Sequence, residues 1–207
     1  MGVIRPSALN PRPGLVLPLL GGWVGTLILS AGIFLAPVFG LPFIDVPHLV
    51  GGIFCDSPTA AFWLGFWLNF IAGAFVFPSL FAVVWPMMPG SGVGILGATV
   101  KGLGFGVALW VLSGVLLPVA GWLNRLPPDV VQRPGFFAIH TGWTGVLAAL
   151  GGHLVYGLSV GLIAAMGEGI FPVETLGWPG HRRAETPPAG RLYPDPNMPE
   201  HPPIGER

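Results

Sequence analysis

The sequence predicts an all-α fold, an integral membrane four-helix bundle followed by a Pro-rich extended C-terminal tail. Of its 207 residues, 52% are apolar and only 9% are charged, whereas a water-soluble domain carries about 25% charged residues to keep its surface hydrated. Four segments also reach the roughly 20 apolar residues that a helix needs to cross a bilayer core. Most of the chain is therefore expected to lie in lipid.

Charge and proline divide the chain into three parts. Residues 1–171 carry nine charged residues, and residues 172–207 carry the other nine together with nine prolines. The last segment has few bulky apolar side chains, so it cannot bury enough surface by itself to offset its ordering entropy. We expect an N-terminal segment (1–14), a four-span transmembrane bundle (15–171) and a Pro-rich polar tail (172–207) that docks on a partner protein.

The four predicted spans cover residues 15–38, 59–85, 93–119 and 137–166. The first span follows Arg5 and Arg12, as the core of a signal peptide would. Its apolar run is longer than the roughly 7 to 15 residues of such a core, however. We therefore expect this segment to be retained as a membrane span.

The first connection, residues 40–58, is too apolar for a solvated loop, and its prolines stop a helix from running through it. It either lies along the membrane surface or folds back into it. Asp45 and Asp56 are expected to cap helices. A helical turn would place Asp45 and His48 on one face, where they could contribute to a metal site. Two ligands are too few for such a site, so an Asp–His hydrogen bond or simple capping is favoured.

The other two connections are short or polar. Residues 86–92 are rich in proline and glycine and predict a tight turn between antiparallel helices. Lys101 lies one or two turns into the third span, and its amine is expected to reach the inner membrane interface. Residues 121–135 carry Arg125, Asp129 and Arg133 and predict an outer loop.

Glycine is abundant, with 33 residues, and in lipid it allows helix backbones to approach closely. Tight packing within the bundle is the favoured interpretation, and docking of a partner helix is the alternative. The small-xxx-small spacing occurs three times, at Gly21 and Gly25, Gly102 and Gly106, and Gly157 and Gly161.

Four spans place both termini on one side of the membrane. With the N-terminus inside, the inner segments carry seven Lys and Arg residues and the outer ones carry two. An excess of basic residues marks the cytoplasmic side. We therefore expect a multi-pass protein of the cell inner (plasma) membrane with both termini in the cytoplasm.

Polar residues within a span are costly, so they are the first place to look for function. His153 lies near the centre of the fourth span, and Tyr156 follows one turn later on the same face. Asn69 lies at a similar depth in the second span. The sequence favours a helix-packing role for this group, with an interhelical hydrogen bond between Asn69 and His153.

Haem binding is the alternative for His153, the candidate cofactor ligand. A b-type haem in a membrane takes axial histidines from facing helices. His140 and His153 share one predicted span, on nearly opposite faces and about 20 Å apart along its axis, and no other span contains histidine. The sequence therefore predicts no intrinsic cofactor. A haem or pigment shared with a partner chain stays open.

Composition excludes several classes of function. The net charge is zero, so no basic face for nucleic acid is predicted. The single cysteine, Cys55, cannot form an internal disulfide. The sequence contains no phosphate-binding glycine loop, no HExxH motif and no Ser–His–Asp constellation. We therefore expect a protein that is not an enzyme.

Three stretches carry a resemblance to known proteins: LAPVFGLPFID at the end of the first span, WLGFWLNFIAG in the second and HLVYG in the last. With them, residues 21–161 resemble a family of small four-helix prokaryotic integral membrane proteins of unknown function. The resemblance implies a membrane protein and no particular activity. Family members often have histidine where this chain has Asn69, so no shared histidine metal site is implied.

Two functions are favoured, and an enzyme ranks third. The first is a non-catalytic accessory or structural subunit of a larger membrane complex, for instance a respiratory or photosynthetic electron-transfer assembly. Its partners would be the lipid bilayer and other integral membrane subunits. The second is a small membrane transporter or channel, indicated by the mid-span residues Asn69, His153 and Tyr156.

Overall fold

A computed structural model describes residues 14–88 and 94–166 of the chain. Helices take up 81% of this part, which contains no strand. The chain divides into two units, residues 1–171 and 172–207, and every described residue belongs to the first. The predicted tail and residues 1–13 of the predicted N-terminal segment lie outside the described residues.

The all-α prediction is confirmed for the described residues. Four helices are long and apolar enough to cross a membrane, and each coincides with a predicted span: Val16–Phe39, Pro58–Met87, Ile95–Leu123 and Phe136–Met166. The third continues four residues beyond its predicted end. Pro118 lies inside it without ending it, which transmembrane helices tolerate.

Most of the long helices are built from more than one element. In chain order the described elements are α1 (Val16–Leu35), η2 (Ala36–Phe39), α2 (Val46–Gly51), α3 (Pro58–Ile71), the π-helix η3 (Ala72–Val76), α4 (Phe77–Val84), η4 (Trp85–Met87), α5 (Ile95–Leu123), η5 (Phe136–Thr141) and α6 (Gly142–Met166).

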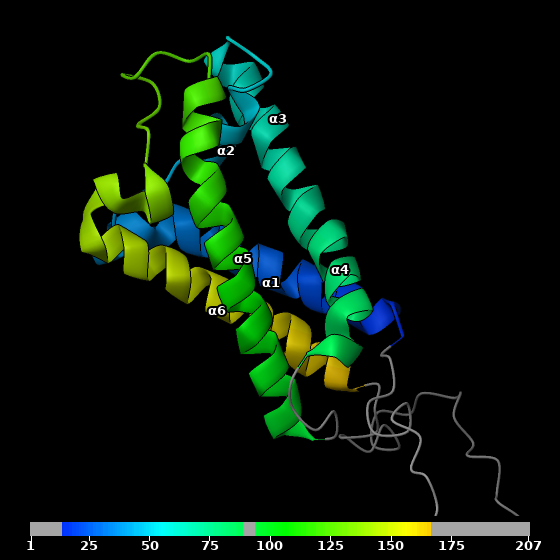
Figure 1. Ribbon diagram of the computed structural model, residues 1–207. Helices are drawn as coiled ribbons and strands as arrows, with labels where there is room; N and C mark the ends of the chain where they lie inside the picture. The colour runs from blue at the N-terminus through cyan, green and yellow to red at the C-terminus, as the bar shows by residue number, and fades with distance from the viewer. Residues whose placement is uncertain (1–13, 89–93, 167–207) are drawn as a thin grey trace, which may run out of the picture. The chain divides into compact units, whose positions relative to one another are not determined.

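The helix α6 is central to the packing. It contacts α5 along one side and α1 along another, while α1 also packs on η3 and α4. In Figure 1, α1 and α6 lie side by side and cross the direction of α5. The short helix α2 packs on α3. This arrangement leaves the first half of α3 held mainly by α2.

Glycines make the close contacts of α6 possible, as the sequence predicts. A Cβ on Gly21 of α1 would lie 2.7 Å from the Val160 Cα, and one on Gly161 would lie 2.8 Å from the Gly102 Cα on α5. Real Cβ atoms essentially never approach so closely. The α1–α6 and α5–α6 contacts therefore join backbone to backbone.

The buried core lies where α4, α5 and α6 meet, around Phe81, Trp85, Phe105 and Val160. Lys101 belongs to this region and is only 1% exposed. Its amine donates to the Trp85 carbonyl oxygen at 3.3 Å and lies 4.2 Å from the centre of the Trp85 ring. The amine thus lies against Trp85 at the end of the second span, and its position at the inner membrane interface stays a prediction.

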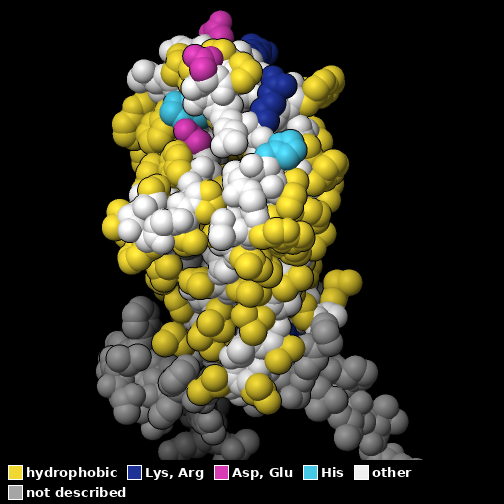
Figure 2. All heavy atoms as spheres, turned by 90° about the vertical axis from the view of Figure 1, so that its left-hand side faces the viewer, with side chains coloured by type: hydrophobic (Ala, Val, Ile, Leu, Met, Phe, Trp, Pro, Cys, Tyr) yellow, Lys and Arg dark blue, Asp and Glu magenta, His cyan; other side chains and the backbone are white. Residues whose placement is uncertain are grey.

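The outer surface of the long helices is apolar. Large hydrophobic side chains are exposed along all of them, for example Leu27, Trp67, Val115 and Leu147. Figure 2 shows hydrophobic side chains over the middle of one face, while the Lys, Arg, Asp, Glu and His side chains on that face gather near one end. A monomer in water rarely exposes so large an apolar surface.

The first connection folds into α2. The predicted Asp45 cap is confirmed, because its carboxylate accepts from the His48 N–H at 3.1 Å. Asp56 is not a cap, since Ser57 occupies the N-cap position of α3. Asn124, just after α5, holds this connection by donating to the His48 and Leu49 carbonyl oxygens at 3.0 and 2.9 Å.

Candidate functional site: a cavity between the helices

A cavity of about 600 Å³ lies between the long helices. Its walls are mostly aliphatic and aromatic, and no described residue that lines it is Asp, Glu, Lys or Arg. Polar and indole side chains reach it from all four long helices. They are Thr26, Ser30, Asn69, Trp110, Ser113, His153 and Tyr156. The three polar residues that the sequence singles out at mid-span thus line one cavity.

His153 forms hydrogen bonds at both ring nitrogens. Its Nδ1 lies 2.7 Å from the Ala149 carbonyl oxygen, which can only accept, so Nδ1 carries the proton. In the neutral ring, Nε2 then presents its lone pair to Ser113 Oγ on α5, 3.2 Å away. The Ser113 hydroxyl also lies 3.1 Å from the Trp110 carbonyl oxygen. It therefore has a second acceptor if Nε2 takes another partner.

The predicted hydrogen bond between Asn69 and His153 is not formed in the described structure. His153 bonds to Ser113 because α6 packs closely against α5. The half-buried Asn69 side chain has no hydrogen-bond partner among the described residues, although it lines the same cavity. Its amide keeps both donor and acceptor capacity.

Tyr156 is buried and donates its hydroxyl to the Gly73 carbonyl oxygen at 2.6 Å. Gly73 lies in the π-helix η3, where the Phe77 N–H bonds to the Ala72 carbonyl, five residues back. In that register the Gly73 carbonyl would need an N–H from residue 78, which is proline and has none. Tyr156 supplies the missing donor. The π-helix therefore provides the carbonyl oxygen that holds the Tyr156 side chain at the cavity wall.

Two buried donors on the cavity wall lack a hydrogen-bond partner within the described part of the chain. They are the Thr26 hydroxyl on α1 and the indole N–H of Trp110 on α5. Thr26 packs against Gly73, where an added Cβ would overlap its hydroxyl oxygen. Such groups are normally paired in protein interiors. Both polar atoms are closed off from the cavity, so they offer no hydrogen bond to a molecule bound there.

A strained turn places an aromatic ring at the cavity. Phe137 and Ala138 have positive φ angles of 52° and 63°, a left-handed conformation that costs most non-glycine residues energy. The Phe137 ring lies against Gly114, where a Cβ would overlap it. The centroid of this ring is 4.7 Å from the centroid of the Trp110 ring. The turn thereby brings Phe137 to the cavity wall beside Trp110.

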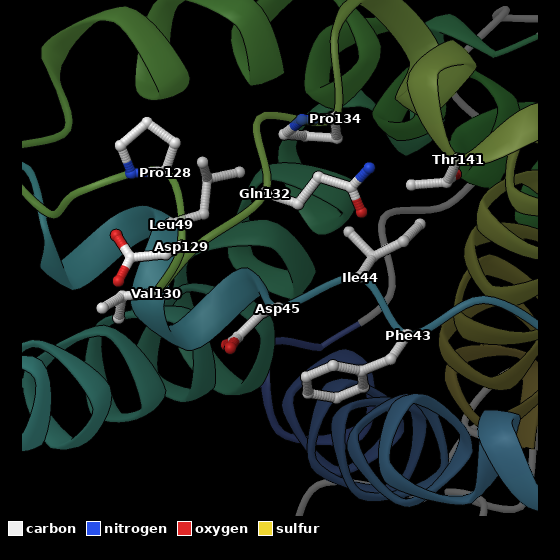
Figure 3. Close-up of a pocket in the computed structure, with 10 residues that line it drawn as sticks. All are labelled: Phe43, Ile44, Asp45, Leu49, Pro128, Asp129, Val130, Gln132, Pro134 and Thr141. Atoms are coloured by element: carbon white, nitrogen blue, oxygen red, sulfur yellow. The ribbon is translucent and has the colours of Figure 1, made fainter.

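A second, smaller pocket of about 270 Å³ lies between the first and third connections. Figure 3 shows Asp45, Asp129 and Gln132 among the side chains that line it. The Asp45 carboxylate is engaged by His48, whose Nδ1 lies 2.7 Å from Asp45 Oδ2. No group of three or more metal-ligating side chains of the His, Cys, Asp and Glu types occurs in the described part of the chain. The Asp45–His48 pair is thus a hydrogen-bonded pair at the start of α2.

The central cavity suits binding better than acid–base chemistry. Ser113 and His153 are adjacent, but the ring is oriented by a backbone carbonyl, and no described carboxylate lines the cavity. A nucleophilic serine normally needs an acidic group that orients its histidine. A mostly apolar cavity with a few convergent polar groups is typical of sites for small molecules.

The described residues therefore define a helical protein with four helices able to cross a membrane and an apolar cavity between them. Comparison of the chain with protein-family models, curated proteins and solved structures finds no match.

Proposed function

We propose that this chain is a multi-pass membrane protein that holds a lipophilic molecule in its central cavity, as a non-catalytic accessory subunit of a larger membrane assembly. The cavity carries the proposal, because polar residues from all four long helices meet there within apolar walls. The apolar outer surface supports a position in the bilayer. A respiratory or photosynthetic electron-transfer complex would be such an assembly.

We propose the inner (plasma) membrane with both termini in the cytoplasm. The even number of spans and the arginines of residues 172–207 support this orientation. Other integral membrane subunits are the expected partners. Mild extraction from native membranes followed by size analysis tests this part. Migration of the chain as a bare monomer would argue against an accessory role.

Two glycines offer a matched pair of variants for testing the cavity. Gly151 lines the cavity and Gly104 lies on the exposed surface of α5. A Cβ on either would meet nothing within 4 Å. We expect Gly151→Leu to fill the cavity and remove the lipophile that co-purifies with the full chain, while Gly104→Leu retains it. Mass spectrometry of the extracted protein measures the bound molecule, and equal retention by both variants would refute the proposal.

A small transporter or channel is the second candidate. The convergence of Asn69, Ser113 and His153 on one cavity favours it. The lack of charged lining side chains among the described residues argues against a path for ions, which usually pair with charged or carbonyl groups. Flux through reconstituted vesicles that is lost in His153→Ala would favour this alternative over the subunit.

A further inference from the structure

We propose that the lipophile is a neutral lipid alcohol, whose hydroxyl head group binds between Ser30 of α1 and Asn69 of α3. This inference rests on the proposed function, since it names what the cavity holds. It is drawn from the charge of the cavity, from the hydrogen-bonding capacity that its lining leaves open, and from the lining residues that also reach the outer surface.

The cavity walls favour a neutral molecule. No Lys, Arg, Asp or Glu lies among its described lining residues, so a phosphate, carboxylate or ammonium group would enter without a counter-ion. Burying an unpaired charge is far more costly than burying a hydrogen-bonded hydroxyl. Fatty acids, phospholipid head groups and amines are therefore disfavoured.

Two polar side chains of the lining are both unpartnered and open. Ser30 and Asn69 are half-buried, line the cavity and have no hydrogen-bond partner among the described residues. Their polar atoms are not closed off. In the described part of the chain, the closed-off side-chain atoms without a partner belong to Thr26, Trp85 and Trp110. A molecule in the cavity can therefore reach the Ser30 hydroxyl and the Asn69 amide, each of which both donates and accepts.

Ser30 and Asn69 lie at the same level of two antiparallel helices. Thr26 on α1 packs against Gly73, where an added Cβ would overlap the threonine hydroxyl oxygen. Farther along, aromatic rings of α1 and α3 meet again, with centroids 6.4 Å apart. Ser30 is one turn after Thr26, and Asn69 is one turn before Gly73, so both lie between these two contacts. One small head group can therefore bind to both side chains.

Apart from the two closed-off groups, the other polar side chains of the lining can only accept. The hydroxyl protons of Ser113 and Tyr156 are donated within the chain, and His153 Nε2 carries a lone pair. Acceptors therefore outnumber donors around the cavity, and an ether, ester or ketone has no proton to give them. A hydroxyl can donate to the Asn69 carbonyl oxygen and accept from the Ser30 hydroxyl at the same time.

The rest of the cavity suits an apolar tail. Ile28, Leu112 and Leu116 line it and are also exposed on the outer surface. The cavity therefore borders the apolar exterior between α1 and α5, where lipid would lie. A tail can extend there into the bilayer, and the ligand can enter from it without crossing water.

Equilibrium binding of tritiated tetradecanol to the full chain in lipid nanodiscs tests the inference, with empty nanodiscs as the baseline. Ser30→Ala and Asn69→Leu each remove one of the two open polar groups. Ser79→Ala is the matched control, because Ser79 is not among the lining residues and already donates to the Phe75 carbonyl oxygen. We expect each cavity variant to weaken binding about three- to tenfold, and the control to bind as the unaltered chain does.

A second probe, methyl tetradecyl ether, keeps the tail and the oxygen but has no proton to donate. We expect it to bind more weakly than tetradecanol. Equal binding of the two probes that is lost in Gly151→Leu would overturn the alcohol assignment and leave the lipophile cavity standing. Tetradecanol affinity unchanged in both Ser30→Ala and Asn69→Leu would also overturn it. Binding of neither probe would overturn the proposed function as well.

Discussion

Single glycines determine how closely α5 and α6 approach. A Cβ on Gly106 would overlap the His153 carbonyl oxygen, and one on Gly157 would lie 2.6 Å from the Gly106 nitrogen. These neighbours are backbone atoms, which cannot rotate away as a side chain can. The approach of the two helices also sets the 3.2 Å contact between Ser113 and His153. The glycines therefore shape the cavity although they do not line it.

Gly106→Ala is expected to destabilise the protein by about 1–3 kcal/mol, because the added methyl group must push α6 away from α5. Gly104→Ala is the matched control in the same helix, where the methyl group meets open space and helix propensity is slightly improved. Thermal unfolding in detergent compares the two. Equal melting temperatures would show that the α5–α6 contact is looser than described.

The glycine spacing could be read from the sequence, but its consequence for His153 could not. The three small-xxx-small pairs do lie where α6 meets its neighbours. Which polar residue would face His153 depends on how each helix is rotated about its axis. That rotation follows from packing along the whole helix, so Ser113 could not be preferred to Asn69 in advance.

At the scale of elements, hydrogen bonds between the first and third connections hold the short helix α2 in place. Besides its two bonds to α2, Asn124 accepts from the Leu126 N–H through Oδ1 at 2.9 Å. The Arg125 N–H bonds to the Gly52 carbonyl oxygen at 2.8 Å. The end of α5 thereby holds α2, and α2 holds α3. From the sequence, residue 124 belongs to an ordinary outer loop. Its role was not predicted, because its hydrogen-bond partners lie 75 residues or more away in the chain.

Asn124→Asp is expected to destabilise the protein by roughly 2–4 kcal/mol. The substitution preserves shape but replaces two donated hydrogen bonds by a buried carboxylate facing the His48 and Leu49 carbonyl oxygens. Asp56→Asn makes the reverse change at an exposed position and should have little effect. Proteolysis of the first connection in nanodiscs measures the release of α2, and equal cleavage of both variants would contradict this role of Asn124.

At the scale of the molecule, length and hydropathy were enough to predict the four long helices, because the need for about 20 apolar residues does not depend on how helices pack. The cavity could not be predicted, since it forms where α1, α3, α5 and α6 fail to fill the space between them. The hydropathy pattern also did not predict the π-helix or the strained turn at Phe137. Each depends on contacts between segments far apart in the chain.

The position of the four helices across a bilayer is tested most directly by labelling single cysteines with a membrane-impermeant maleimide. In a Cys55→Ser background, Met87→Cys and Asp129→Cys place exposed thiols at opposite ends of α5, a helix of 29 residues and about 43 Å long. Trp67→Cys places one on the exposed apolar surface between the ends of its span. Intact cells and inverted vesicles expose opposite faces of the membrane to the reagent.

We expect Asp129→Cys to react in intact cells, Met87→Cys to react only in inverted vesicles, and Trp67→Cys to react in neither. If Met87→Cys reacted in intact cells and Asp129→Cys only in inverted vesicles, the proposed orientation would be contradicted but the membrane-spanning arrangement would stand. Reaction of both from the same face, or ready labelling of Trp67→Cys from water, would contradict the membrane-spanning arrangement itself.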